Sequence, residues 1–259
     1  APISGSQNTG IDNKRINLGI VQPGEKPVKF SDALNRLANT ATHIHSDTGR
    51  FWYATSPSLN KMATDIAQSL DEQLVLDTID QHLTKYINGI ADRAGFDSVH
   101  CAPGSSADIP DEAGGVRVVV MSVRNAHTTG NVSSEAMDET KNIISHRGAA
   151  PRVYKNSLVF LAPDKRALDN LKDAVRLSLA WSQIVNDRDK LNLTQGNLAI
   201  AESKMSETGN IFETRMKETW SWILYPSQVS AHEDIQYSAS KLSSQDRLFD
   251  RMQKKLEGD

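Results

Sequence analysis

Three basic residues flank a predicted turn in the middle of the chain, and together they could bind phosphate. Arg147 ends a predicted helix, and Arg152 and Lys155 follow the turn at Gly148. Arginine can pair with two phosphate oxygens through parallel N–H groups, whereas lysine acts as a point charge. We therefore identify these three side chains as candidate contacts to a DNA backbone. The alternative is ordinary surface charge, because basic residues are common on solvated faces.

A second candidate set lies in a predicted β-hairpin, where two short strands flank a turn that ends at Gly49. Glycine favours such a turn because it accepts a positive φ. A short helix followed by a hairpin is typical of the end of a winged helix, whose hairpin can lie along a DNA groove. His43, His45 and Arg50 are therefore the candidate DNA contacts of this hairpin.

The same two histidines raise the alternative of a metal site. His43 and His45 are two positions apart on a strand, so both would point to one face, with Asp47 nearby. Zinc usually takes three or four protein ligands, and the spacing places no third ligand here. We therefore predict two polar residues on the solvated face of the hairpin and no metal ion.

An acidic loop after the first strand of a predicted sheet offers a catalytic alternative. Asp108, Asp111 and Glu112 could hold a metal in a nuclease or hydrolase, which would also need a lysine after the next strand. That position holds Arg117, within the strand itself. An exposed acidic loop is therefore the preferred interpretation, and a metal-dependent nuclease or hydrolase is kept as the alternative.

The composition limits the class of protein. The chain has 259 residues, a net charge of −3 and a single cysteine, which excludes an internal disulfide and favours a reducing cytoplasm. That cysteine, Cys101, follows His100 in a predicted strand, so the two side chains would face opposite ways and could not act as nucleophile and base. No apolar run approaches the roughly 20 residues of a membrane helix. We predict no catalytic residue and no membrane contact.

The hydrophobic pattern predicts an α/β protein. The apolar runs 118–121 and 158–161 do not alternate, which favours strands buried on both faces. Strands that alternate with helices imply a small, partly parallel sheet with flanking helices. The predicted regions are a linker or arm with a short strand at 16–21 (1–29), a winged-helix-like helix plus hairpin (30–56), an α/β domain (57–163), a long helical region packed on it (164–228) and a polar helical tail (229–259).

Several sequence segments together resemble the C-terminal half of the proteins in a family of very large AAA-type ATPases. The family was long labelled a domain of unknown function, and its members sit beside DNA methylases and helicases in BREX-like phage-defence islands. The resemblance covers roughly residues 10–228. It is carried by residues 15–24, 49–61 (with Gly49-Arg-Phe-Trp-Tyr-Ala-Thr55), 152–164 (with Ser157-Leu-Val-Phe-Leu-Ala-Pro-Asp164), 174–181 and 215–224.

The resemblance implies an accessory role. The chain contains no Gly-Lys dipeptide and hence no G-x-x-x-x-G-K-[ST] phosphate loop, so the family's ATP-binding motifs would lie upstream. No cofactor is expected in this segment, whereas the parent protein would bind ATP and Mg²⁺. The implied function is a non-catalytic C-terminal accessory region, and its implied partners are the upstream ATPase module, DNA and defence-system proteins. A protein-interaction scaffold without DNA contact is the alternative.

Overall fold

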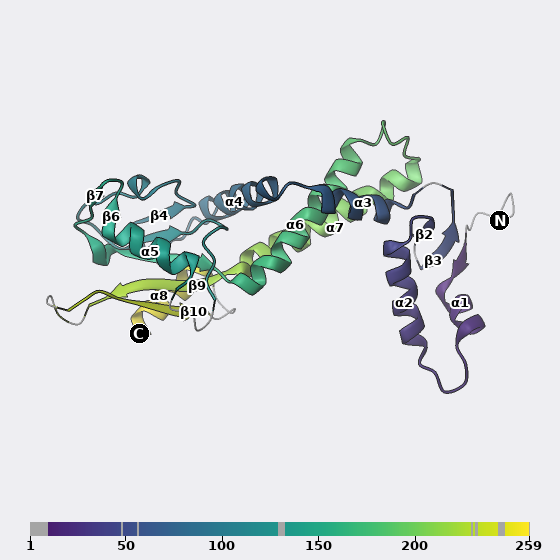
Figure 1. Cartoon of the computed structure of the whole chain (residues 1–259), viewed down its shortest axis with the longest axis horizontal. Coiled ribbons are helices and arrows are strands. Elements are labelled where there is room, and N and C mark those ends of the chain that lie inside the picture. The colour runs from purple at the N-terminus through teal and green to yellow at the C-terminus, as the bar shows by residue number, and fades with distance from the viewer. Residues whose placement is uncertain are drawn as a thin grey trace. The chain divides into compact units, whose positions relative to one another are not determined.

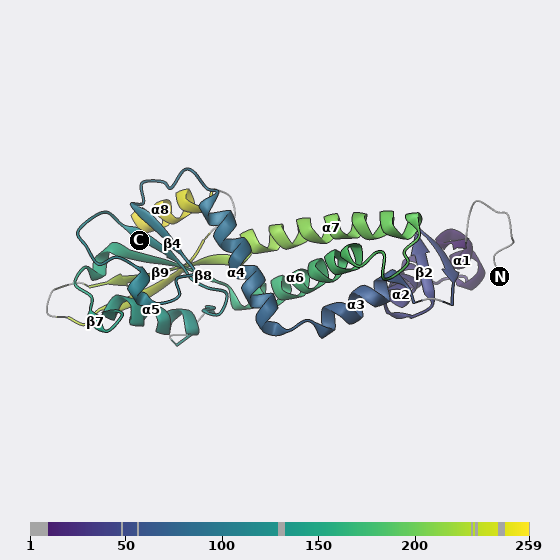
Figure 2. The same cartoon turned by 90° about the horizontal axis from the view of Figure 1, so that it is seen from above.

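The computed structural model divides the chain into two compact units. One unit comprises Ala1–Leu70 with Arg176–Gly209, and the other comprises Asp71–Val175 with Asn210–Asp259. Two long helices, α6 (Lys165–Asn186) and α7 (Gln195–Thr219), run side by side in Figures 1 and 2, and each contributes one part to each unit. The structure describes residues 10–47, 49–55, 57–128, 133–228, 230, 233–242 and 247–258.

The N-terminal part of the first unit is a small helix–sheet fold. Three short antiparallel strands lie in the order β1-β3-β2, and the two helices come between β1 and β2 along the chain. Its core consists of Ala38, Ile44 and Phe51, with Leu34 and Ile16 packed against them. The elements are β1 (Ile11–Asp12), α1 (Asn13–Ile20), α2 (Pro27–Thr40), β2 (Ile44–Asp47) and β3 (Arg50–Tyr53).

Local sequence explains how this fold begins. The side chain of Asp12 accepts the backbone N–H of Arg15 and caps α1, and Pro27 begins α2, where its missing N–H costs nothing. A Cβ at Gly10 would lie 2.5 Å from the carbonyl oxygen of Phe51, so β1 can reach β3 only with glycine there. The chain at 16–21, predicted as a strand in a linker, instead forms helix α1, because the Asp12 cap and the buried side of Ile16 favour a helix.

The rest of the first unit is helical. Helix α3 (Leu59–Ser69) packs with the C-terminal half of α6 and the N-terminal half of α7. The side chain of Ser58 accepts the N–H of Lys61 and caps α3. The buried residues of this helical cluster are Ala63, Ala180, Trp181, Ile184 and Ala201.

The second unit contains a mixed five-stranded sheet in the order β10-β9-β8-β5-β4. Strands β4, β5 and β8 are parallel, β9 is antiparallel to β8, and β10 is antiparallel to β9. The predicted α/β class with a partly parallel sheet is therefore confirmed. The strands are β4 (Ser98–Cys101), β5 (Arg117–Val120), β8 (Leu158–Pro163), β9 (Trp220–Ser227) and β10 (Gln236–Lys241).

Both faces of this sheet are buried. Val119 and Phe160 lie on the face that packs against α5 (Glu135–Ser145), whose Ile143 and Ile144 are buried there. Their neighbours of opposite orientation, such as Val118, are also fully buried. Helix α4 (Glu72–Asn88) buries a four-residue stripe of its own, namely Val75, Ile79, Leu83 and Ile87.

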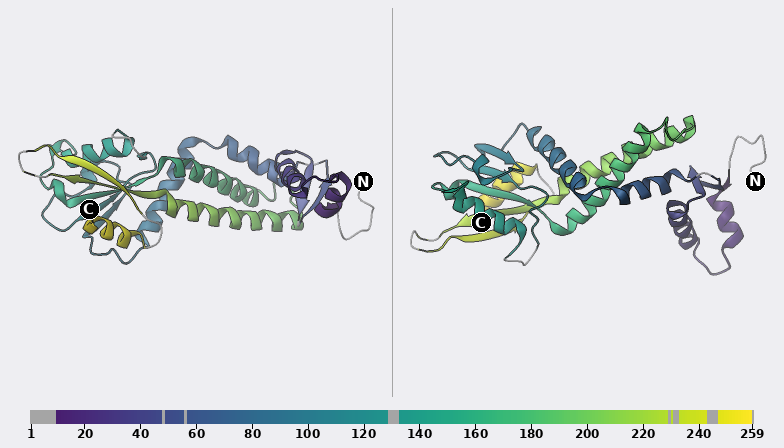
Figure 3. Two further views of the ribbon diagram at one scale, coloured as in Figure 1. Left: turned by 90° about the horizontal axis from the view of Figure 1, so that it is seen from below. Right: turned by 45° about the horizontal axis from the view of Figure 1, so that its top comes forward.

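The C-terminal part differs from the prediction. The region predicted to be helical through 228 changes to strand β9 at Trp220, and the predicted polar helical tail contains β10 before helix α8 (Leu248–Gly258). The β9 strand pairs with β8 on one side and β10 on the other, so its backbone hydrogen bonds come from residues distant in sequence. Figure 3 shows β9 and β10 running together as a hairpin. Among the described helices, none is long and apolar enough to cross a membrane.

Candidate nucleic-acid interface

Helix α2 presents two basic side chains directly away from the core of its unit. Ala38 is buried and Leu34 is half-buried, and both face the small sheet. At 100° per residue, the positions of Lys29 and Arg36 around the helix axis differ by only about 20°. Both positions lie opposite the buried side of α2. Both are exposed. The helix therefore carries a basic stripe on its free face.

The small residues beside these two cations are compatible with close approach to a ligand. Ala33 and Thr40 lie on the same free face and are exposed, and both are small. Asp32 borders the face and is exposed as well, so the stripe has one acidic neighbour. We call the set Lys29, Ala33, Arg36 and Thr40 the α2 free face.

The hairpin residues that the sequence singled out have different surroundings. His43 is exposed, whereas His45 is half-buried and stacks on Trp52 with ring centroids 5.8 Å apart. Arg50 donates from Nη2 to the carbonyl oxygen of Gly10 at 2.6 Å, which ties β1 to the hairpin. The tip residue Thr48 and the side chain of Asp47 lie outside the described residues. Only His43 of the three candidates presents an exposed side chain.

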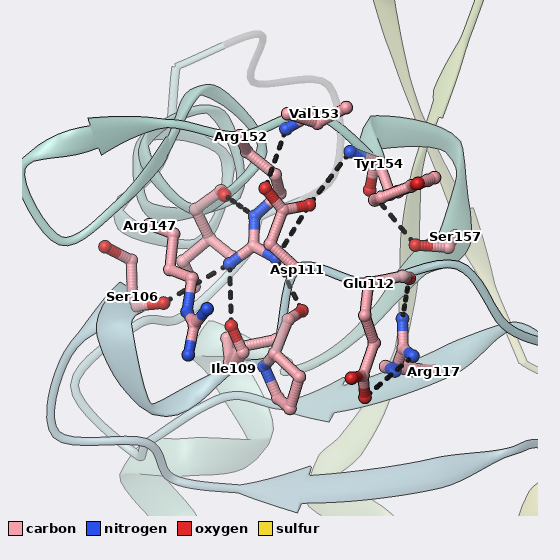
Figure 4. Close-up of polar contacts among 12 residues, drawn as sticks. Ser106, Ile109, Asp111, Glu112, Arg117, Arg147, Arg152, Val153, Tyr154 and Ser157 are labelled. Carbon is pink, nitrogen blue, oxygen red and sulfur yellow. Dashed lines mark hydrogen bonds and ion pairs between the residues drawn. The ribbon is translucent and has the colours of Figure 1, made fainter.

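Arg152, one of the three predicted phosphate contacts, is an interior residue. Its side chain is 0% exposed. Its guanidinium donates to four backbone carbonyls, as Figure 4 shows in part: Ile143 at 2.8 Å, Pro110 at 2.8 Å, Ile109 at 3.1 Å and Ser106 at 3.2 Å. Arg152 is therefore not a phosphate contact, because its side chain is buried and four of its five N–H groups already donate to internal carbonyls.

The other two members of that cluster remain at the surface. Arg147 lies in strand β6 (His146–Arg147), which pairs with β7 (Ala150–Pro151), and it is exposed. Its Nε is 3.5 Å from the carbonyl oxygen of Ala107. Lys155 opens a short 3₁₀ turn, Lys155–Ser157, and is half-buried. The structure thus separates two surface cations from the buried Arg152.

The acidic loop holds the fold together. Asp111 accepts the backbone N–H groups of Val153 and Tyr154 at 2.8 and 2.9 Å, and these bonds lower its pKa against the opposing effect of burial. Glu112 lies 3.5 Å from Nη2 of the buried Arg117 (Figure 4). Asp108 and Glu112 are exposed, as the sequence predicts, and Asp111 is half-buried, so the acidic loop is at the surface but anchored by these contacts.

The third carboxylate of this loop also binds backbone. The side chain of Asp108 accepts the N–H of Ser105 at 2.9 Å and completes a capping box around the 3₁₀ turn Ser106–Asp108. Within the described ranges, no group of three or more histidine, cysteine, aspartate or glutamate residues could hold a metal ion. Nothing in the arrangement of Asp108, Asp111 and Glu112 adds support to the metal-dependent alternative.

The carboxyl edge of the parallel strands carries another buried polar group. Asp164 follows β8 and is buried; it accepts hydrogen bonds from Nε1 of Trp222 at 3.0 Å and from Nζ of Lys241 at 2.8 Å. Burial alone would raise the pKa of Asp164, but the bonds from Lys241, Trp222 and the N–H of Ala167 outweigh it and hold the pKa at about 2. This carboxylate is therefore ionised and internally paired.

A serine–histidine contact lies near the same edge. Nδ1 of His127 is 2.9 Å from Oγ of Ser134, and both residues are buried. Ser134 also accepts the N–H of Met137 as the cap of α5, and His127 packs edge-on against Trp222. Burial lowers the pKa of His127, so the ring is neutral near pH 7. These contacts give both side chains a structural role at the start of α5.

Cys101 has the properties expected of a small interior residue. Burial raises the pKa of its thiol to about 11, so the thiolate nucleophile is scarce at neutral pH. Its sulfur accepts from the hydroxyl of Thr84 at 3.6 Å, whereas His100 contacts Ser98 at 3.0 Å. The histidine and the cysteine therefore have separate partners.

Comparison of the chain with family models, with curated proteins and with solved structures found no significant match. The candidate site accordingly stands on geometry. The sequence analysis does not identify Lys29 or Arg36, because the boundary between the arm (1–29) and the helical unit (30–56) separates the two residues, whereas α2 spans Pro27–Thr40. Their seven-residue spacing, opposite Leu34 and Ala38, was the signal that could have identified them.

Proposed function

We propose that residues 10–55 bind duplex DNA as a winged-helix-like unit. We propose further that the chain is a non-catalytic accessory region of a cytoplasmic phage-defence AAA-type ATPase, which it couples to DNA. In this proposal the ATP and Mg²⁺ belong to an ATPase module of the parent protein. The chain would transmit the state of that module to the bound duplex.

One observation carries the DNA proposal: the connection of the small fold combined with its basic free face. A strand, two helices and a hairpin follow one another, and the sheet order is β1-β3-β2. That is the arrangement of a winged helix, in which the second helix of the pair is the one that enters the major groove. Here the second helix is α2, and Lys29 and Arg36 project from its free face.

The electrostatics of α2 fit contact with the DNA backbone. Arg36 can pair with phosphate oxygens through two N–H groups, and Lys29, two helical turns earlier, can reach a second phosphate. The small side chains of Ala33, between the two cations, and Thr40, one turn beyond Arg36, permit close approach of the helix to the groove. His43, exposed at the start of the hairpin, would lie beside the wing. The net charge of −3 of the whole chain makes such local basic stripes the means of attracting a polyanion.

The protein-scaffold alternative is favoured by a different observation. Val153 and Tyr154 are exposed apolar residues of the α/β unit, and Arg147 of the same unit is exposed too; apolar and basic residues of this kind can contact protein as readily as phosphate. The two proposals make different predictions about salt, because counterion release accompanies contact with DNA.

Fluorescence anisotropy of a labelled duplex, measured over a salt series, tests the DNA proposal. Each phosphate contact contributes about −0.9 to the slope of log K against log salt. The double variant Lys29→Ala/Arg36→Ala should therefore flatten the slope by about 2 and weaken all duplex sequences alike.

The matched control is Arg147→Ala/Lys155→Ala, which removes the same charge from the α/β unit. We expect this control to keep the wild-type slope. If only the control lost affinity, the DNA site would lie on the α/β unit and the proposal for α2 would be wrong. If the wild type bound no duplex even at low salt, the scaffold alternative would replace the DNA proposal.

A further inference from the structure

We infer that strand β10 is the interface through which two copies of this chain pair edge to edge. The inference concerns the α/β unit and is independent of the proposed DNA site. Strand β10 stands at the end of the five-stranded sheet, with β9 on its inner side. An edge strand carries a row of backbone donors and acceptors that another strand can satisfy.

The register identifies which backbone groups point outward. Leu242 donates its N–H to the carbonyl oxygen of Ser221 at 2.8 Å, and Lys241 lies opposite Trp222. Hydrogen-bonded and non-hydrogen-bonded pairs alternate along an antiparallel ladder. It follows that Ser238 and Ser240 bond to β9, whereas the N–H and C=O groups of Tyr237, Ala239 and Lys241 face away from β9.

The strand lacks most of the features that protect a sheet edge. Over Gln236–Lys241 it contains no proline, and its pairing with β9 runs without a bulge. Its single charged residue, Lys241, lies at the end, where its Nζ already binds Asp164 at 2.8 Å. Natural edge strands are usually shortened, kinked or charged, so a regular six-residue strand of this kind is suited to pairing.

A second copy of the same strand fits this edge. The outward-facing residues 237, 239 and 241 are symmetric about Ala239, so a twofold axis there would place each Tyr237 opposite Lys241 of the partner subunit. Within its own chain, Nζ of Lys241 binds Asp164 and lies 5.5 Å from the ring centre of Trp222, and Nζ of Lys141 lies 6.0 Å from the ring centre of Tyr237, so the fit rests on the backbone ladder. On the other face, Ser238 would lie opposite Ser240 of the partner subunit. Among the residues of the two β10 strands themselves, no like charges would be directly opposed.

Twofold symmetric dimers are the commonest assemblies of a single chain, because one patch serves both partners. A ladder of this length buries less than the roughly 1,200 Å² of a standard stable interface. We therefore expect a reversible dimer that dissociates on dilution.

Sedimentation velocity over a concentration series tests the interface. The full chain should form a dimer at high concentration, and Ala239→Pro should remain a monomer, because proline removes an outward N–H but no bond to β9. Circular dichroism establishes whether this variant keeps its fold. A concentration series in which the wild type stays monomeric would overturn the inference.

Cysteine cross-linking tests the register without relying on proline. In a Cys101→Ala background, Ala239→Cys should form a disulfide-linked dimer on mild oxidation, because directly opposed Cα atoms on the axis lie about 5.5 Å apart. Ser238→Cys is the matched control and should not cross-link, since its opposed residue is the partner's Ser240. Equal cross-linking of the two variants, or dimerisation with no cross-link at 239, would place the contact elsewhere and overturn the inference.

Discussion

The indole N–H of Trp222 donates to the carboxylate of Asp164 at 3.0 Å, and both side chains are buried. Trp222 belongs to β9, and Asp164 lies between β8 and α6, so the bond joins segments 58 residues apart. The other oxygen of Asp164 accepts the N–H groups of Arg166 and Ala167 and caps α6. The carboxylate of Asp164 thereby links β9, the start of α6 and, through Lys241, the end of β10.

The stability of the fold should depend on the charge of Asp164. Its pKa in the folded chain is about 2, below its ordinary value of 3.8, so its contribution is complete above about pH 4 and is lost as the pH falls through 2. A shift of this size corresponds to about 2 kcal/mol. Asp164→Asn should lower the free energy of unfolding by about that amount at pH 7, and the difference from wild type should shrink towards pH 3. Urea unfolding at several pH values measures this, with the exposed Asp169→Asn as control. A deficit that did not change with pH would show that the charge is not the cause.

Arg152 and Arg147 should differ sharply in their effect on stability. Replacing a buried arginine that donates to four carbonyls leaves these carbonyls and the carboxylate of Asp111 without their cation, so Arg152→Met should cost about 3–5 kcal/mol. Arg147 is exposed, and Arg147→Met should change the free energy of unfolding by less than about 0.5 kcal/mol. Denaturant unfolding measures the free energy of unfolding of both variants. Similar losses for both would contradict the interior position of Arg152.

Phe160 should be among the residues most costly to truncate. It is 0% exposed and lies in the sheet core beneath α5. Phe160→Ala should cost about 3–5 kcal/mol, since the closely packed surroundings cannot fill the cavity. Ile211→Ala, at a residue that is 40% exposed, is the control and should cost far less. A loss below about 1 kcal/mol for Phe160→Ala would contradict the strand assignment.

This chain by itself should show no saturable binding of ATP. A phosphate loop needs consecutive backbone N–H groups and a lysine that follows glycine, and the chain has no Gly-Lys dipeptide. Isothermal titration calorimetry with Mg-ATP at micromolar protein should therefore give only heats of dilution. Stoichiometric, tight binding would refute the accessory role that we propose.

Elements whose local pattern allows one interpretation could be predicted from the sequence. The unbroken apolar runs 118–121 and 158–161 can be satisfied only by burial on both faces, and the structure buries them as β5 and β8. The glycine at position 49 predicted the turn of the hairpin, because glycine accepts a positive φ. In the structure, Gly49 has a φ of +77°.

The burial of particular polar groups and the positions of the last strands depend on long-range contacts, which a local pattern does not show. Residues 220–227 follow a helix without a breaker, and they become β9 because β8 and β10 supply hydrogen bonds that no local pattern reveals. Arg152 resembles a surface cation in sequence. It is buried because the 106–110 segment, some 42–46 residues earlier in the chain, turns its carbonyls onto the guanidinium. Long-range partners of this kind set the energy of a charged group, so its sequence neighbours alone could not place it.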